Sequence, residues 1–377
     1  MKYIIFLGDG MSDEGELTPL MEANTPNIDR LAKEGQTGLV KVIPEGLKPG
    51  SDVANMSILG YNPGMFYSGR GPLEAASIGV ALNPEDVAYR CNFVTIQGGK
   101  MADFTAGHVK TAEAQKYIEL LNEKLGSDRI KFYPGVSYRN LLVIKNGPCD
   151  FKATPPHDIT GQEVAEYLPS GKESQLINDM MEMSKHILPG KHPSQIWLWG
   201  QGRKPAMPSF KSKTGLTGAV VTAVDLIKGI GRLIGLDTPD IKGATGYFDT
   251  DYNAKAESAL EILQEKDFVF IHVEAPDEAG HEGNRKEKIR AIENFDQKIV
   301  GRIMRELPEI DSQYRVLVLP DHPTPLGKKT HTSDPVPFIM CGTGIVQDQA
   351  ERYNERDVNR ENVIEEGWTL LEKLIKS

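Results

Sequence analysis

The sequence predicts an α/β fold in which a mostly parallel central sheet is covered by helices on both faces. Three continuous apolar runs have the length of strands, and strands buried on both faces of a parallel sheet are apolar throughout. These runs are residues 3–7, 268–273 and 316–320. Residues 288–307 carry apolar side chains at helical spacing, and alternation of strands with helices is typical of the α/β class.

The middle of the chain has a different pattern of short strand-like pieces, helical stretches and many Pro and Gly turns. Residues 140–144 are predicted to form a strand, and residues 115–125 and 161–186 are predicted to be helical. The segment 197–213 is rich in Gly, Pro and basic residues, and we interpret it as a hinge or a substrate loop.

These patterns predict two domains, of which the first is discontinuous. We expect a core formed by residues 1–80 and 208–377, with a smaller α+β domain, residues 81–207, inserted as a substrate or lid domain. The chain has 377 residues, which suits such a layout.

Composition excludes several classes of function. The formal net charge is -10, which argues against a nucleic-acid surface or an anionic membrane as the partner. The three cysteines form no CxxC pair and no disulfide framework. The apolar run at residues 3–7 is too short to span a membrane and has no cleavage pattern, so we expect a cytoplasmic protein. The partner is expected to be a small molecule, and the oligomeric state is left open.

Acidic and histidine residues follow each of the three apolar runs. Asp9 lies between two glycines after the first, and Asp321 and His322 follow the third. After the second run, Asp277 and His281 are four residues apart and share one face of a helix. Taken singly, these residues are also typical of turns and surface pairs. Together with His331, a loop residue, they should meet at one edge of the sheet, and they predict a two-metal centre.

Ser51, in the sequence Pro-Gly-Ser-Asp, is the candidate nucleophile. In one interpretation it only caps the helix that follows. In the other, the free N–H groups at that helix terminus favour a phosphate, and a nearby metal activates the hydroxyl. Ser57, Ser68 and Ser77 compete with it on sequence grounds.

Six motifs in a fixed order resemble those of the cofactor-independent phosphoglycerate mutases, in the short archaeal-type branch of the alkaline phosphatase superfamily. The resemblance runs through essentially the whole chain. The motifs are Gly8-Asp9-Gly10, Pro49-Gly50-Ser51-Asp52, Gly69-Arg70-Gly71, Pro276-Asp277-Glu278-Ala279-Gly280-His281, Asp321-His322 and His331-Thr332-Ser333-Asp334-Pro335-Val336-Pro337.

This resemblance implies an alkaline-phosphatase-like core, two divalent metal ions (Mn, Zn or Mg) and no need for 2,3-bisphosphoglycerate. One ion would be held by Asp277, His281 and His331, and the other by Asp9, Asp321, His322 and the Ser51 oxygen. The implied reaction interconverts 3-phosphoglycerate and 2-phosphoglycerate through phosphoserine. The small phosphorylated substrate would be bound by cationic and polar side chains, for which the candidates are Arg70, Arg90, Arg139, His108, His157, Asp158 and Lys213.

Two departures from the mutases fall in the expected substrate domain. His108 follows Ala106-Gly107, where the mutases have arginine, and the segment 197–203 contains tryptophans that they lack. A bacterial branch with the same metal motifs has been proposed to be a homoserine kinase, although no GxxxxGK[ST] loop is present here. A phosphate-ester hydrolase and a catalytically silent metal-binding protein are further alternatives.

Overall fold

The computed structural model describes residues 1–377, which divide into two compact units. The first unit comprises Met1–Tyr67 and Met207–Ser377, and the second comprises Ser68–Ala206. The division after residue 67 differs from the expected boundary at residue 80. The reason is helix α5 (Arg70–Ser77), which packs on the sheet of the second unit, where Ala75 joins Leu82 and Ala88 in a small apolar cluster.

The first unit is built on a seven-stranded sheet with the order β12-β2-β11-β10-β1-β9-β8. At its centre β1 (Lys2–Gly8) pairs in parallel with β10 (Tyr314–Leu319) and with β9 (Phe268–Val273). These strands are the three predicted apolar runs. The other strands are β2 (Gln36–Val40), β8 (Gly218–Val221), β11 (Val336–Gly342) and β12 (Val363–Ile364). Because β11 is antiparallel to both neighbours, the sheet is mixed but mostly parallel, which confirms the predicted fold class.

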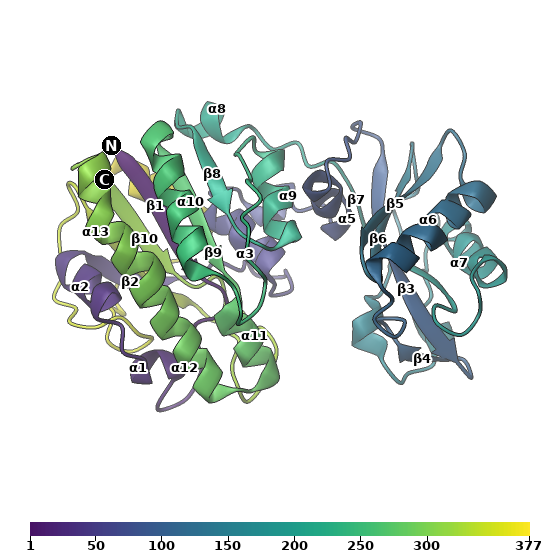
Figure 1. Ribbon diagram of the computed structural model, residues 1–377, viewed down its shortest axis with the longest axis horizontal. Helices are drawn as coiled ribbons and strands as arrows, with labels where there is room; N and C mark the ends of the chain where they lie inside the picture. Colours follow the sequence, from purple (N-terminus) through teal and green to yellow (C-terminus); the bar gives the residue numbers. More distant parts are fainter. The chain divides into compact units, whose positions relative to one another are not determined.

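Helices cover both faces of this sheet (Figure 1). Ile4, Phe6 and Ile271 face one layer of helices and form the largest apolar core with it. This layer contains α2 (Pro26–Glu34), α10 (Tyr252–Glu265), α12 (Arg285–Asn294) and α13 (Gly301–Ile310). The π-helical turn η3 (Phe295–Val300) joins α12 to α13, so the predicted helix at 288–307 is one continuous helical run.

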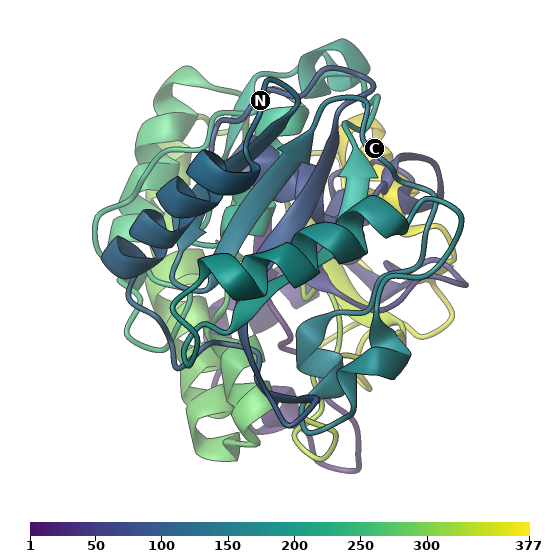
Figure 2. The ribbon, with the colours of Figure 1, turned by 90° about the vertical axis from the view of Figure 1, so that its right-hand side faces the viewer.

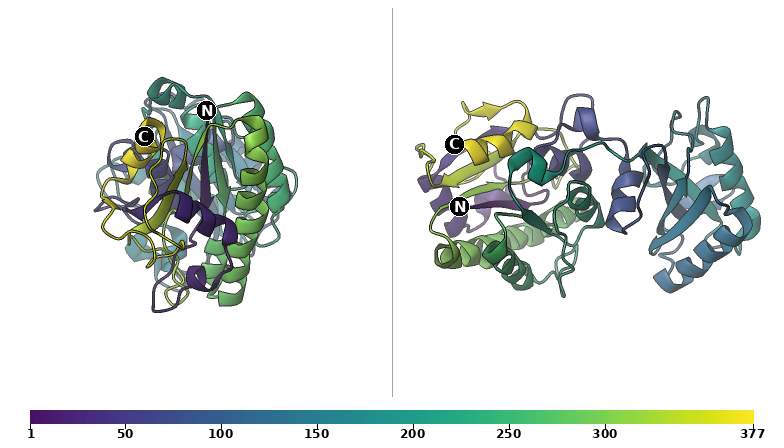
Figure 3. Two further views of the ribbon diagram at one scale, coloured as in Figure 1. Left: turned by 90° about the vertical axis from the view of Figure 1, so that its left-hand side faces the viewer. Right: turned by 90° about the horizontal axis from the view of Figure 1, so that it is seen from above.

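On the opposite face, α9 (Asp225–Leu233) packs on β8 and α14 (Leu370–Lys376) packs on β10. Figure 3 shows α14 in yellow across the sheet from the green helices. The remaining helical segments of this unit are α1 (Pro19–Glu22), α3 (Ser51–Ile58), α4 (Pro63–Phe66), α8 (Phe210–Thr214), α11 (Ala275–Glu282) and η4 (Gly367–Thr369). No helix of the chain combines the length and the apolar character needed to cross a membrane.

The second unit has a five-stranded antiparallel sheet, in which β3 (Val87–Gln97) pairs with three partners. The other strands are β4 (Lys100–Asp103), β5 (Ile130–Val136), β6 (Arg139–Ile144) and β7 (Gln195–Arg203). Helices α6 (Thr111–Leu125) and α7 (Gln175–Ile187) cover one face, as Figure 2 shows, and α5 covers the other.

Two sequence predictions for this unit are wrong. The stretch 161–186 is not one helix, because Pro169 and Gly171 interrupt it; it contains the 3-10 turn η2 (Val164–Tyr167) and then α7. The segment 197–213 is not a loop throughout. Its first part, up to Arg203, belongs to β7, which pairs with β3, and Trp197 and Leu198 are fully buried. Its glycines allow the backbone to pass close to neighbours, and a Cβ on Gly202 would lie 2.1 Å from the Ser68 carbonyl oxygen.

Candidate metal centre

The acidic and histidine residues of the first unit gather where three parallel strands end. Asp9 follows β1, Asp321 and His322 follow β10, and α11, which begins just after β9, carries Asp277 and His281. Neighbouring parallel strands present their carboxyl ends at the same edge of a sheet, which is where ligands bind in α/β proteins. His331 reaches the same place from the loop before β11.

Asp277, His281 and His331 form what we call the outer group. Nε2 of His281 lies 3.1 Å from Asp277 Oδ2 and 3.0 Å from Nε2 of His331, which in turn is 3.5 Å from Asp277 Oδ1. On its other side His281 Nδ1 lies 3.1 Å from the carbonyl oxygen of Lys329, to which it donates. A carbonyl at Nδ1 fixes the ring so that Nε2 points inward, as in metal-binding histidines. The hydrogen bond to Asp277 raises the pKa of His281 to about 9.

Asp9, Asp277 and His322 form the inner group, in which His322 is fully buried. Nε2 of His322 lies 3.6 Å from Asp9 Oδ1 and 3.5 Å from Asp321 Oδ2. Burial lowers the pKa of His322 below its ordinary value, so the ring is neutral and has a lone pair to offer. Asp321 is oriented by three donors, namely the backbone N–H groups of Gly10 and His322 and the side-chain amide of Asn55.

Three carboxylates share this buried space. Burial, followed by the charges of Asp321 and Asp277, raises the pKa of Asp9 well above its ordinary value. Burial would also raise the pKa of Asp277, but its hydrogen bonds with His281 and His331 outweigh burial and hold the pKa well below the ordinary value. Asp9 Oδ1 is buried with no hydrogen-bond partner. Buried acidic oxygens normally have donors or a cation, so this donor set fits divalent cations.

Gly10 makes room for this arrangement. Its φ is +58°, and a Cβ atom at this position would lie 2.4 Å from Asp277 Oδ1. A side chain here would therefore displace the Asp277 carboxylate as well as strain the backbone. Gly10 therefore leaves room for the Asp277 carboxylate of α11 beside Asp9, which follows β1.

Ser51 is the first residue of α3, and Gly50 occupies the N-cap position, so Ser51 does not cap the helix. Its hydroxyl oxygen lies 3.2 Å from Nε2 of His322. Of the competing serines, Ser68 donates to the carbonyl of Arg203 and Ser77 to that of Glu74, all within the second unit. Ser57 is buried within α3. Ser51 is the serine whose hydroxyl contacts the histidine of the inner group.

One residue of this site was missed in the sequence. His272 lies within β9, is fully buried, and has Nε2 at 3.2 Å from Asp9 Oδ2. It forms a further group of candidate metal ligands with Asp9 and Asp321. The sequence signal that could have identified His272 is a histidine inside an otherwise apolar strand, five residues before Asp277.

Comparison with known proteins identifies the family. A family model described as 2,3-bisphosphoglycerate-independent phosphoglycerate mutase matches residues 32–194. A relative of that name from Methanosarcina barkeri is 49% identical over 379 aligned residues, which cover 96% of this chain and 95% of the relative. The chain belongs to this family. A relative from Geobacter sulfurreducens, named as a probable mutase of the same kind, is 47% identical and aligned over 100% of both chains.

Solved structures agree with this membership in the mutase family. The cofactor-independent phosphoglycerate mutase from Thermoplasma acidophilum is 25% identical, with a TM-score of 0.66 over 100% of this chain and 99% of that chain. The PH0037 protein from Pyrococcus horikoshii is 27% identical, with a TM-score of 0.83 over 99% of this chain and 96% of that chain. The two-unit fold described above is thus shared along the whole chain.

Two of the predicted arginines, Arg70 and Arg90, lie beside Trp199 in the second unit. The Arg90 guanidinium lies 4.5 Å from the centre of the Trp199 ring, and that of Arg70 lies 5.9 Å from it. Arg90 is buried, and its Nε lies 2.8 Å from Oε1 of its counter-ion Glu74. The two groups form an ion pair, but their geometry is not that of a hydrogen bond. Burial, partly offset by Glu74, lowers the pKa of Arg90, and the nearby charges of Arg70 and Arg139 lower it further.

Other predicted residues extend the same set of rings. His157 packs edge-on against Trp199, with ring centres 5.4 Å apart, and against Phe104. Tyr138 contacts both His108 and Arg139. Asp158 lies beside His157, with Oδ1 at 3.6 Å from Nε2. Lys213 is not part of this set. It lies in α8 of the first unit, with its ammonium 5.2 Å from the centre of the Tyr61 ring.

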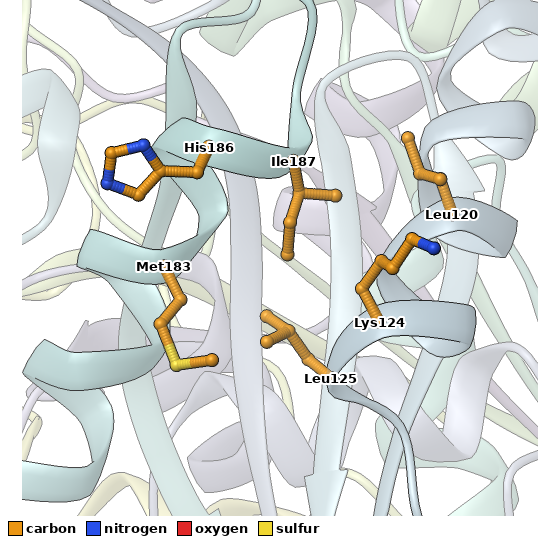
Figure 4. A pocket seen from close by; sticks show the side chains of 6 residues that line it. All are labelled: Leu120, Lys124, Leu125, Met183, His186 and Ile187. Atoms are coloured by element: carbon orange, nitrogen blue, oxygen red, sulfur yellow. The ribbon is translucent and has the colours of Figure 1, made fainter.

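A separate pocket of about 370 Å³ lies between α6 and α7 (Figure 4). Its lining is mainly apolar and includes Leu120, Leu125 and Ile187. None of the predicted site residues lines it, and its polar lining residues are Lys124 and His186, with no carboxylate. It therefore has no part in the chemistry assigned to the metal centre.

Proposed function

We propose that this chain interconverts 3-phosphoglycerate and 2-phosphoglycerate by transferring the phosphoryl group through Ser51. The observation that carries this proposal is the position of the Ser51 hydroxyl, 3.2 Å from Nε2 of His322 and beside a buried set of carboxylates and imidazoles. Relatives named as mutases along nearly the full chain support phosphoglycerate as the substrate. Because Ser51 itself carries the phosphoryl group, this route needs no 2,3-bisphosphoglycerate.

Two divalent ions belong to this proposal, with Mn, Zn or Mg as candidates. Asp277, His281 and His331 would hold one, and Asp9, Asp321, His322 and Ser51 would hold the other. Carboxylate and imidazole ligands without a thiolate suit these metals. When bound, the ions lower the pKa of the serine hydroxyl and neutralise charge on the phosphoryl oxygens.

The chain's own groups account for the remaining chemistry. Ser51 Oγ attacks phosphorus, so that one P–O bond to serine forms while the P–O bond to glycerate breaks. The glycerate then turns and takes the phosphoryl group back on its other hydroxyl, which regenerates the serine. Ser51 opens α3, and unpaired N–H groups at a helix N-terminus stabilise a phosphate. Water must stay away from the phosphoserine, because hydrolysis would release free phosphate.

The arginines of the second unit, Arg70, Arg90 and Arg139, are assigned to the substrate's anionic groups. The charges of Arg70 and Arg139 lie close enough to Arg90 to lower its pKa, and Glu74 is the counter-ion of Arg90. Arginine offers a planar fork that matches a carboxylate. His108, His157 and Asp158 belong to the same proposed substrate surface. The contact of Lys213 with Tyr61 gives no support for a role in substrate binding, so that role of Lys213 stays a prediction.

Phosphorus NMR distinguishes the proposed activity from its alternatives. The purified full chain is incubated with Mn²⁺ and 3-phosphoglycerate, and separately with homoserine and ATP. Appearance of 2-phosphoglycerate supports the mutase. O-phosphohomoserine as the product would establish a homoserine kinase, and release of free phosphate alone would establish a hydrolase. Absence of turnover with bound metal would favour a silent metal-binding protein.

A further inference from the structure

Asn55 is a side chain of α3 that links the candidate nucleophile to the metal centre. It lies four residues after Ser51, so the two side chains lie on the same face of the helix. Asn55 is fully buried, and its amide nitrogen Nδ2 donates to the carbonyl oxygen of Ser51 at 2.8 Å and to Asp321 Oδ2 at 2.9 Å. One amide group therefore bridges the first turn of α3 and the end of β10.

The partners of Asn55 fix the orientation of its amide. A backbone carbonyl only accepts hydrogen bonds, so the atom beside the Ser51 carbonyl must be the amide nitrogen, which has two protons to donate. The other amide atom, Oδ1, is buried and has no hydrogen-bond partner. A buried acceptor without a donor is costly. The donor half of Asn55 is therefore the half that the structure uses.

Helix stability gives no reason for an asparagine at this position. Asparagine has a lower helix propensity than alanine, and the flanking residues Ala54 and Met56 are apolar and buried. An apolar side chain would occupy the same place without leaving a buried oxygen unsatisfied. It could not, however, donate to Ser51 and Asp321 at once. The link between these two residues is thus what distinguishes asparagine from the apolar alternatives.

This link determines where the Ser51 hydroxyl lies. The other oxygen of Asp321, Oδ1, accepts from the backbone N–H groups of Gly10 and His322, at 3.1 and 2.9 Å, so the carboxylate is fixed on that side. Asn55 donates to the free side of the same carboxylate and holds the first turn of α3 beside the end of β10. The N-cap residue of α3 makes no side-chain hydrogen bond that could fix this turn instead. Ser51 begins the turn, with its hydroxyl oxygen 3.2 Å from Nε2 of His322.

We propose that Asn55 is a positioning residue for the nucleophile. Its amide holds the first turn of α3 against Asp321, so that Ser51 Oγ already lies at the metal centre when the substrate binds. Displacement of a reacting atom by about 1 Å can reduce a rate about 10²-fold. Asn55 acts through Ser51 and is not itself a metal ligand. This inference rests on the proposed function, because the reaction that Asn55 assists is the transfer of the phosphoryl group to Ser51.

Single-turnover kinetics of the full chain test this role. Protein with saturating Mn²⁺ is mixed with 3-phosphoglycerate, quenched in acid at successive times, and phosphoserine at residue 51 is measured by mass spectrometry. Asn55→Ala should reduce the rate of phosphoserine formation and kcat by about 10²-fold, with KM close to the wild-type value. Asn55→Asp has the same shape but replaces the donor by an oxygen, and it should lose at least as much. Asn122→Ala is the matched control, because Asn122 also makes two hydrogen bonds, both to the backbone of Phe132 in the second unit, and it should keep the wild-type rate.

A second measurement needs neither metal nor activity. In nitrogen NMR spectra of metal-free wild-type protein, the side-chain amide signals of Asn55 are identified by their absence in Asn55→Ala. Their protons should exchange with solvent much more slowly than those of Asn253, which is exposed on α10, because both of them are buried in hydrogen bonds.

Several outcomes would overturn the inference. They are wild-type phosphorylation rates in both Asn55 variants, a raised KM with unchanged kcat, an equal loss of rate in Asn122→Ala, and fast exchange of the Asn55 amide protons. Circular dichroism monitors folding, and if both Asn55 variants are unfolded while Asn122→Ala is folded, Asn55 is a structural residue and the inference is wrong. If the wild type itself forms no phosphoserine at residue 51, the proposed function fails instead.

Discussion

The hydroxyl oxygen of Ser51 lies 3.2 Å from Nε2 of His322, and this contact joins the N-terminus of α3 to the end of β10. A nucleophile and a metal-binding imidazole within this distance can share one ion. The same relationship separates Ser51 from the other serines considered, none of which has such a contact.

Replacing Ser51 by Ala should therefore abolish mutase activity, by about 10⁴-fold or more, the scale expected for removal of a covalent nucleophile. Metal content should stay close to that of the wild type, because the Asp and His ligands are retained. Ser77→Ala is the matched control, since Ser77 donates to a carbonyl of its own helix, and it should keep normal activity. Activity in Ser51→Ala would rule out this nucleophile.

His331 completes the outer group through contacts with Asp277 and His281. His331→Ala should lose one equivalent of metal and at least about 10²-fold in kcat, as expected when a charge-stabilising group is removed. Elemental analysis of the dialysed protein measures the first effect. Lys329→Ala is the control, because it keeps the backbone carbonyl that accepts from His281. An unchanged metal count in His331→Ala would remove His331 from the centre.

The raised pKa of His281, about 9, predicts how metal-free protein responds to pH. A histidine whose folded pKa exceeds its unfolded value stabilises the fold below the unfolded pKa and loses this contribution as pH rises through the folded pKa. Metal-free protein should lose stability between about pH 6.5 and pH 9. Over the same range metal affinity should rise, because the ion must displace the proton. Chemical denaturation with and without Mn²⁺ measures both trends, and His281→Gln should flatten the first.

Part of this site could be predicted from the sequence because local patterns determined it. Three apolar runs followed by Asp9, Asp277 and Asp321 identify parallel strands whose ends meet, and the structure pairs these strands as neighbours. The four-residue spacing of Asp277 and His281 places both on one face of α11, where they contact each other at 3.1 Å.

Other features depended on pairing that the sequence does not reveal. His272 looked like one more strand residue, and only the register of β9 against β1 brings its ring to Asp9. The glycines and Arg203 made β7 resemble a loop, whereas its pairing with β3 makes it a buried strand. The division after residue 67 depends on α5 packing on the second sheet, a tertiary contact.

Trp199 should matter for substrate binding more than for chemistry, because it holds Arg90 and Arg70 against its ring. Trp199→Ala should raise KM for phosphoglycerate by about 5–30-fold, corresponding to roughly 1–2 kcal/mol of cation–π interaction. Trp199→Phe, which keeps a ring but loses the hydrogen bond to Asn92, should have a smaller effect. Steady-state kinetics measure both; a change confined to kcat would contradict this role.

The buried pair of Lys255 and Glu274 predicts a large effect on stability. Lys255 is fully buried and donates to Glu274 and to the carbonyl of His272. Lys255→Met should lower the free energy of unfolding by about 3–5 kcal/mol, because it leaves an uncompensated buried charge. Lys228→Met, which breaks the pair with exposed Asp240, should cost no more than about 1 kcal/mol. Urea denaturation measures the free energy of unfolding of both variants. An equal decrease in Lys255→Met and Lys228→Met would show that the buried pair contributes no more than the exposed one.

The most direct test of the account is to trap the phosphoryl group on the enzyme. Metal-loaded protein is mixed with 3-phosphoglycerate, quenched in acid within one turnover, digested and mapped by mass spectrometry. The account predicts a phosphoryl group on the peptide containing Ser51 and on no other serine peptide. Turnover to 2-phosphoglycerate with the Ser51 peptide unmodified at every quench time would contradict it.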